Sequence, residues 1–369
     1  MKTPRSGNKI AASVVILLLL GLVAFLGAFV FPGHRILYPF GKDGYIGFIN
    51  ENKKLVVEPK YTSVGRFSEG LAFARVEPGL YECINTKGKV VFRIEADQFM
   101  RDYKEGLAAF KKDGKWGFID RKGNIVIEPQ YLYVPSFSEG LVGVGSFVFD
   151  SFYINKKNED VFGERFYSCG AFSEGYAVVG KWPGGRDTGD AKDTRYGIIN
   201  HNGEVVVPIK YRVVRDVSDG LYGIGVFPES MPPDGEIEEW MSWVFIDIET
   251  GEVQFEWPNV GIRYPYNGYL AAYFKEEDSY GIINTKGEIV VEPQFDRITE
   301  IPSEGLYVVY KEGVGEWYIT PTGKEVFPVK FDVARPFYGK LARVVKDGKS
   351  GYIDRKGEII YIEDILASK

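Results

Sequence analysis

Short runs of hydrophobic and aromatic residues alternate with polar turn residues along most of the chain, and the arrangement returns about every 35 residues. In the clearest copy, Glu105 to Leu141, three such runs cover Leu107 to Lys112, Lys115 to Asp120 and Asn124 to Glu128. Runs of this length between hairpin turns are typical of antiparallel strands. Each copy therefore predicts a meander of three strands.

The repeat is traced most easily through the residue that ends the second run, which is Asp120 in the clearest copy. Successive copies lie 34 to 47 residues apart, and a period of this size indicates a repeat architecture. We expect an all-β repeat domain of nine meanders over residues 35–369. The nine positions are Asn50, Asn85, Asp120, Asn155, Asn200, Asp247, Asn284, Thr320 and Asp354.

Glycine marks both predicted turns of the unit. Asp113-Gly114 joins the first strand to the second, and Gly123 lies late in the second turn. Tight hairpins need residues with positive φ, which glycine adopts without a penalty from a Cβ atom. The second turn is the most regular part of the repeat, and its glycine recurs as Gly88, Gly203, Gly287, Gly323 and Gly357.

The residues after the third run predict how the units are joined. Proline is expected to end the third strand, because it cannot donate a ladder hydrogen bond. Further on, Phe137 precedes Glu139-Gly140, and this ring is expected to hold the connection against the next meander. The acid recurs in most copies, which favours local hydrogen bonds to the backbone over chemistry at one place. The prolines are Pro59, Pro129, Pro208, Pro293 and Pro328.

Both faces of a meander carry apolar residues. In the clearest copy, Trp116 and Phe118 share one face and Ile119 lies on the other. Such a meander must be covered on both sides by its neighbours, as in propeller blades or stacked repeats. A propeller-like ring and an open superhelix both fit this pattern. The count of nine units, and the lack of a half-repeat shared between the two ends, argue against a simple closed ring.

These motifs resemble the WG-repeat family of bacterial proteins over residues 35–369. The resemblance is carried by Trp116-Gly117 with the strand that follows, by the Lys-Gly turn ending at Gly123, and by Phe137-Ser-Glu139-Gly140-Leu. It implies a β-rich repeat domain, often membrane-anchored or exported, without an assigned activity and without catalytic residues. Four copies lack the glycine of the Trp-Gly pair, and their local packing is expected to differ. Their positions are Asn85, Asn155, Asp247 and Thr320.

The N-terminal region predicts a membrane segment. Residues 10–31 contain no charged side chain, and as a helix they would span about 33 Å against a hydrocarbon core of about 30 Å. Residues 1–9 carry Lys2, Arg5 and Lys9, which favours a cytoplasmic tail and a single-pass anchor with the repeat domain outside the cytoplasm. A cleaved signal peptide is the alternative, although Leu26-Gly27-Ala28 matches a cleavage site poorly.

Composition narrows the function further. The net charge is −6, and without the three basic residues of the tail 42 basic and 51 acidic side chains leave −9, which disfavours nucleic acid as a partner. Two cysteines, Cys83 and Cys169, exclude a disulfide-built scaffold. The two histidines offer little for a metal site or a catalytic triad, and no phosphate-binding loop is present. We expect no metal and no cofactor.

The two longest steps of the repeat point to candidate binding loops. Both arise from insertions in the same turn of consecutive units, Lys181 to Arg195 and Phe227 to Trp243. Insertions in repeat proteins map to one face, often the binding face. Local packing of the tryptophans and a solvated turn for the aspartates are the competing interpretations. The candidate ligand contacts are Trp182, Asp187, Asp190, Asp193, Trp240 and Trp243.

The sequence therefore favours a non-enzymatic, membrane-anchored binding or scaffold protein at the cell envelope, with protein or glycan as ligand. One alternative is an envelope glycan hydrolase that uses two carboxylates in a rim cleft. Another is a spacer that holds a partner away from the membrane.

Overall fold

A computed structural model describes residues 36–99, 102–147, 150–182, 194–218, 220–226, 242–258, 260–298 and 302–363. The predicted tail 1–9 and membrane segment 10–31 lie outside these residues. Within the described part of the chain, no helix has both the length and the hydrophobicity needed to cross a membrane. The repeats, from Ile36 onward, form one compact unit.

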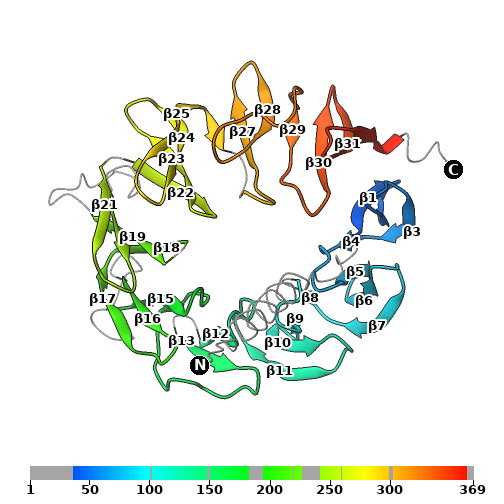
Figure 1. Ribbon diagram of the computed structural model, residues 1–369. Coiled ribbons are helices and arrows are strands. Elements are labelled where there is room, and N and C mark those ends of the chain that lie inside the picture. The colour runs from blue at the N-terminus through cyan, green and yellow to red at the C-terminus, as the bar shows by residue number, and fades with distance from the viewer. Residues whose placement is uncertain are drawn as a thin grey trace, which may run out of the picture. The chain divides into compact units, whose positions relative to one another are not determined.

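The described residues of the repeats form nine antiparallel sheets that are arranged in a ring (Figure 1). The first sheet contains β1 (Tyr38–Lys42), β2 (Tyr45–Ile49) and β3 (Leu55–Tyr61). The second contains β4 (Ser63–Val64), β5 (Leu71–Glu77), β6 (Leu80–Asn85) and β7 (Val90–Glu95). The third contains β8 (Gln98–Phe99), β9 (Leu107–Lys112), β10 (Lys115–Asp120) and β11 (Ile125–Tyr131). The fourth has β12 (Leu141–Phe147) and β13 (Asp150–Asn155).

The remaining sheets follow the same order. The fifth contains β14 (Ser168–Cys169), β15 (Tyr176–Lys181), β16 (Arg195–Asn200) and β17 (Val205–Tyr211). The sixth contains β18 (Val213–Ser218), β19 (Leu221–Val226), β20 (Ser242–Asp247) and β21 (Val253–Trp257). The seventh contains β22 (Val260–Tyr266), β23 (Tyr269–Phe274), β24 (Ser279–Asn284) and β25 (Ile289–Phe295). The eighth contains β26 (Arg297–Ile298), β27 (Tyr307–Lys311) and β28 (Gly315–Ile319), and the ninth β29 (Val333–Ala334), β30 (Leu341–Lys346), β31 (Lys349–Asp354) and β32 (Ile359–Tyr361).

Six sheets contain the predicted three-stranded meander and one additional strand on the inner side of the ring. The prediction of a third meander strand is wrong for the fourth and eighth sheets, where single bridges, Ile154 with Asp160 and Ile319 with Glu325, take its place. In the third sheet β8 pairs with β9, with Gln98 opposite Lys111 and Phe99 opposite Phe110. This inner strand comes from the segment that links one meander to the next, which the sequence pattern predicts only as a connection. Each meander is thus tied to its predecessor by backbone hydrogen bonds as well as by side chains.

The hydrophobic core lies between neighbouring sheets. One cluster joins Trp116 and Phe118 of β10 to Val142 and Val144 of β12. Phe137, in the connection, packs edge-on against Phe118 with the ring centroids 4.9 Å apart. Phe137 also shares the cluster with Val142 and Val144 of the next meander, which confirms the predicted role of the aromatic residue in the connection. Because each sheet is covered on both faces, no meander needs a separate core.

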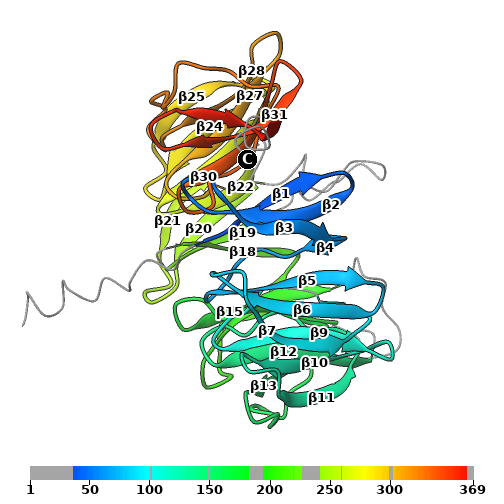
Figure 2. The same ribbon diagram turned by 90° about the vertical axis from the view of Figure 1, so that its right-hand side faces the viewer.

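The ring is closed by contacts between the first and the ninth sheet. Tyr38 and Phe40 share a buried cluster with Leu341 and Tyr352. The backbone N–H of Lys340 donates to the Tyr38 hydroxyl at 2.9 Å. Turned by 90°, Figure 2 shows β1 to β3 between the strands of the ninth sheet above and those of the second sheet below. The two sequence arguments against closure are therefore wrong, because side chains of the end sheets close the ring without a shared repeat.

The prediction that proline ends the third strand is also wrong. β11 continues through Pro129, and its register with β10 places Tyr131 opposite Trp116 and Ile127 opposite Phe118, so the strand bulges between these pairs. β11 is the outermost strand of its sheet, where a missing N–H leaves no ladder partner unsatisfied. The same bulge occurs in the first, fifth and seventh sheets.

The bulge explains the glycine of the Trp-Gly motif. A Cβ atom on Gly117 would lie 2.4 Å from the Ile127 carbonyl oxygen and 2.7 Å from the Pro129 nitrogen. In the second sheet the equivalent position is Glu82, and there β7 runs past it with Arg93 directly opposite and without that bulge. In the sixth sheet the equivalent position is Val244, and β21 likewise runs past it with Glu256 directly opposite and without that bulge.

The repeated acids form hydrogen bonds between units. The carboxylate of Glu105 accepts the backbone N–H of Gly140 at 3.0 Å, 35 residues later. Glu69, Glu139 and Glu174 accept the glycine N–H of the next unit in the same way. This confirms the prediction that the acids of this slot satisfy local backbone groups.

Candidate functional site

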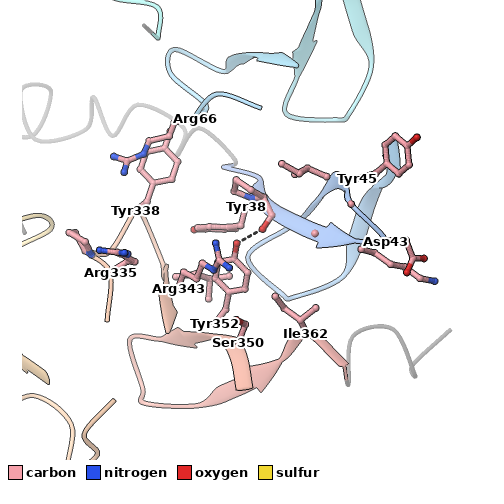
Figure 3. Close-up of a pocket in the computed structure, with 17 residues that line it drawn as sticks. Tyr38, Asp43, Tyr45, Arg66, Arg335, Tyr338, Arg343, Ser350, Tyr352 and Ile362 are labelled. Atoms are coloured by element: carbon pink, nitrogen blue, oxygen red, sulfur yellow. Dashed lines mark hydrogen bonds between the residues drawn. The ribbon is translucent and has the colours of Figure 1, made fainter. Parts of the chain in front are cut away.

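A pocket of about 890 Å³ lies between the first and ninth sheets (Figure 3). One wall is the inner edge of β1 and the hairpin turn Asp43-Gly44 that follows it. The other wall contains Arg335, Tyr338 and Arg343, from the connection to β30 and from β30 itself. Ring closure therefore creates this pocket from residues about 300 positions apart in the sequence.

Tyrosine side chains form the floor of the pocket. The Tyr352 hydroxyl donates a hydrogen bond to the carbonyl oxygen of Pro39 on β1, drawn as a dashed line in Figure 3. Burial raises the pKa of Tyr352 to about 12, although the nearby charge of Arg343 lowers it. Burial likewise raises the pKa of Tyr338 above its usual value, against the opposing charge of Arg66. These phenols stay protonated at neutral pH, so their hydroxyl groups remain hydrogen-bond donors.

The side chains around the pocket are mainly cationic. Arg66, Arg335, Arg343 and Lys42 line it, and Asp43 is the one acidic residue among the described residues of its wall. The guanidinium carbon of Arg66 lies 5.9 Å from the centroid of the Tyr338 ring. Within the described part of the chain, neither Arg66 nor Arg343 forms an ion pair with an acidic side chain, and both are exposed. A local excess of positive charge is unusual on a chain with a net charge of −6.

Arg66 also connects this pocket to two smaller ones. It lines a pocket of about 510 Å³ beside β4, β5 and β8, and another of about 620 Å³ beside Phe137. Asp102 lines both of the smaller pockets. The three pockets therefore meet around Arg66, on the inner side of the first sheets of the ring.

The side chains of this pocket are suited to binding an anionic group. Guanidinium groups form bidentate hydrogen bonds with carboxylates and phosphates, and the protonated phenol of Tyr338 adds a donor, whereas that of Tyr352 is engaged with Pro39. A glycosidase needs a pair of carboxyl groups across its substrate, whereas the described wall supplies only Asp43. No group of three or more His, Cys, Asp or Glu side chains in the described residues is placed to hold a metal ion.

Two of the residues singled out in the insertions, Trp182 and Trp243, belong to the described part of the chain, and neither lines this pocket. Trp182 is half-buried after β15, with its ring 5.1 Å from that of Tyr167. Trp243 is a core residue of the sixth sheet with 1% of its surface exposed, and Arg215 lies over its ring. Asp187, Asp190, Asp193 and Trp240 lie outside the described residues.

The arginines of the pocket are absent from the sequence predictions. Arg66 directly precedes the aromatic residue of its connection, Phe67, and Arg335 lies two positions before Phe337. The clearest copy has Ser136 at the position of Arg66 and Pro135 at the position of Arg335. A comparison of the copies slot by slot would have found the substitutions, but their convergence depends on ring closure.

The sequence pattern described as "WG containing repeat" matches residues 46–79, 83–116, 116–145, 196–225, 280–314 and 318–349. Together these segments make up more than half of the chain. No curated protein matches the sequence at a significant level.

Solved structures give matches in fold. A eukaryotic initiation factor matches with a TM-score of 0.52 and 12% identity over 82% of this chain and 86% of its own. BamB from Moraxella catarrhalis matches with a TM-score of 0.43 and 11% identity, over 81% of this chain and 95% of its own. The WD40 beta propeller domain of Doa1 matches with a TM-score of 0.33 and 15% identity, over 74% of this chain and 92% of its own. At these identities the likeness concerns the fold alone. With six matching segments over more than half of its length, the chain belongs to the WG containing repeat family.

Proposed function

We propose that the protein is a non-enzymatic binding module that holds an anionic group of its partner in the pocket between the first and ninth sheets. The observation that carries the proposal is the set of Arg66, Arg335 and Arg343 around one pocket of an acidic chain. Repeat folds of this kind suggest a binding or scaffold role, and the pocket supplies a place for it.

The side chains define the type of group that would bind. Hydrogen bonds to charged groups contribute about 1.5 to 3 kcal/mol each, so two guanidinium contacts are enough for selective recognition of a carboxylate or phosphate. Tyr45 is half exposed at the rim and offers a ring for stacking. An acidic protein segment and an acidic glycan both match this chemistry.

We also propose that residues 10–31 anchor the protein in the cell membrane and that the repeats bind their partner outside the cytoplasm. The support is the uncharged length of the segment and the basic residues before it. Mass spectrometry of the mature N-terminus and protease accessibility of the repeats in spheroplasts test this proposal. A mature chain that begins near Phe29, or repeats that resist the protease, would contradict it.

The binding proposal is tested by capture of partners from envelope extract with the full-length protein. The Arg66→Glu/Arg343→Glu variant should lose the captured partner, and the wild-type interaction should weaken as salt is raised. Arg297→Glu is the matched control, because Arg297 also lies over a tyrosine ring, that of Tyr310, but outside the pocket. Undiminished capture by the double variant, at an unchanged melting temperature, would refute the proposal.

A further inference from the structure

The first sheet differs from the others on the inner side of the ring. In the second, third and ninth sheets the first long strand pairs with a short inner strand, β4, β8 or β29. In the fourth sheet, where no such strand forms, the backbone N–H of Leu132 still donates to the Gly145 carbonyl at 2.8 Å. Among the described residues, β1 has no inner neighbour and is the edge of its sheet.

The register identifies the backbone groups that this edge presents. Gly41 lies opposite Ile46 on β2, as Lys111 lies opposite Trp116 on β10. The Lys111 carbonyl accepts the N–H of Asp97 at 2.7 Å from the inner segment, and the equivalent carbonyl of Val345 accepts the N–H of Asp332 at 2.9 Å. Because bonding alternates along an antiparallel strand, Gly41 directs its C=O and N–H away from β2. Gly41 lines the large pocket.

The hairpin turn beside Gly41 presents a second hydrogen-bonding group, the backbone N–H of Gly44. In the third sheet the Asp97 carboxylate accepts the backbone N–H of Gly114, and in the ninth sheet Asp332 does the same for Gly348, both at 2.9 Å. The aspartate in each case begins the inner segment. Gly44 holds the equivalent place in the first sheet and lines the same pocket.

The edge can pair only over a short stretch. Pro39 has no N–H, and its carbonyl already accepts the Tyr352 hydroxyl. Five of the inner strands are equally short, since β4, β8, β14, β26 and β29 have two residues each, whereas β18 and β22 have six and seven. Side-chain contacts must therefore supply much of the binding energy.

We propose that the first sheet binds an extended, acidic segment of a partner polypeptide as its inner strand. This inference rests on the proposed anion-binding function and names the partner class. An aspartate of the segment donates its N–H to the Gly41 carbonyl and accepts the Gly44 N–H with its carboxylate, as Asp97 and Asp332 do in their own sheets. A second acid, three residues later, meets the guanidinium groups of Arg66, Arg335 and Arg343. Strand addition of this kind supplies affinity through the backbone and specificity through alternate side chains.

The chain itself provides the template for a probe. The probe is an acetylated peptide amide, Asp-Val-Ala-Glu-Pro-Phe, which copies residues 332–337 with glutamate in place of Arg335. Its matched control carries a methyl group on the aspartate nitrogen, which removes the N–H and leaves every side chain and charge unchanged. Binding of both peptides to the full-length protein is measured by isothermal titration calorimetry. We expect about tenfold weaker binding after N-methylation, and a similar loss for the unmodified peptide with Arg343→Glu.

The outcomes separate this inference from the function on which it rests. Equal binding of the methylated and unmodified peptides would mean recognition by charge alone and would overturn strand addition. Absence of peptide binding, with envelope capture still dependent on Arg66 and Arg343, would overturn the inference and leave the anion pocket intact. Binding that is seen only after residues 364–369 are removed would mean that the chain's own C-terminal residues take this position, and would overturn the assignment to a partner.

Discussion

Gly117 lies directly beneath the backbone of Ile127, so close that a Cβ atom would come within 2.4 Å of the Ile127 carbonyl oxygen. The glycine of the family motif is therefore required by a backbone bulge on the neighbouring strand, which contains Pro129. Motif and bulge occur together in four sheets and are absent together in the second and sixth sheets, which have Glu82 and Val244 in the glycine position. The ninth sheet keeps Gly351 without the bulge, and there a Cβ atom would still lie 2.7 Å from the Ile360 carbonyl oxygen.

Replacing Gly117 by alanine should destabilise the repeat unit by about 1 to 3 kcal/mol, since a backbone atom cannot yield as a flexible side chain does. The free energy of unfolding is measured by urea denaturation. Gly261→Ala is the matched control, because the nearest atom to its Cβ would be 3.6 Å away and its φ is not positive. Equal stability of the two variants would show that the bulge moves freely.

Gly123→Val and Gly287→Val should also lower the melting temperature. Both glycines have positive φ, +94° and +76°, and a Cβ would meet the rings of Phe92 and Phe255 in the preceding sheet. Backbone strain of this type costs about 1 to 3 kcal/mol. Lys122→Val, in the same turn but exposed, is the control. Unchanged melting of both glycine variants would contradict this account of the turn.

Ring closure predicts a role for two hydroxyl groups. Tyr38→Phe removes the acceptor of the Lys340 N–H, and Tyr352→Phe removes the donor to Pro39. Each should cost about 0.5 to 1.5 kcal/mol of unfolding free energy. Tyr45→Phe, at a ring that is 50% exposed, should have no measurable effect. If all three variants are as stable as the wild type, the end sheets do not depend on these contacts.

Glu82 makes stability dependent on pH. Burial alone would raise the pKa of its carboxyl, but hydrogen bonds from Tyr61, Arg93 and Lys60 outweigh burial and hold the pKa below its ordinary value of 4.5. A lowered pKa in the folded state stabilises the protein above the ordinary value, and this contribution is lost as the pH falls below about 4.5 through the folded pKa.

Glu82→Gln should therefore be less stable at pH 7 by about 1 to 3 kcal/mol and should lose less stability than the wild type on acidification. Urea denaturation at pH 7 and at pH values below 4.5 measures both effects. Glu95→Gln, at an exposed position in the same sheet, is the control. A wild type and a Glu82→Gln variant with parallel pH profiles would contradict the assignment.

The sequence predicts the meanders well because the second strand of a meander ends in a side chain that forms hydrogen bonds with the backbone of the turn that follows. Asp120, for example, accepts the backbone N–H groups of Lys122 and Asn124 and so fixes the turn after β10. The inner strands escape prediction because two residues in a connection, such as Gln98 and Phe99, carry no periodic signal.

The pocket is less predictable than the fold. Arg66 and Arg343 lie 277 positions apart, and no pattern in the sequence joins them before the ends of the repeat array meet. Closure itself depends on single contacts, such as the hydrogen bond from the Lys340 N–H to the Tyr38 hydroxyl, and these contacts do not belong to any repeated motif. The two insertions, in contrast, can be found from the sequence alone, because they interrupt the regular spacing of the repeat.

The two candidate binding regions can be separated by one experiment. Shortening both insertions, Lys181 to Arg195 and Phe227 to Trp243, to Asp-Gly turns should preserve the β-type circular dichroism spectrum and cooperative unfolding, because the length of a surface hairpin loop changes stability only slightly. To keep the core intact, Trp243 and the strand residues Lys181 and Arg195 are retained. If the pocket binds the partner, this variant captures it from envelope extract as the wild type does, while Arg66→Glu/Arg343→Glu does not. Loss of capture by the shortened chain, with full capture by the arginine variant, would instead place the binding site in the insertions.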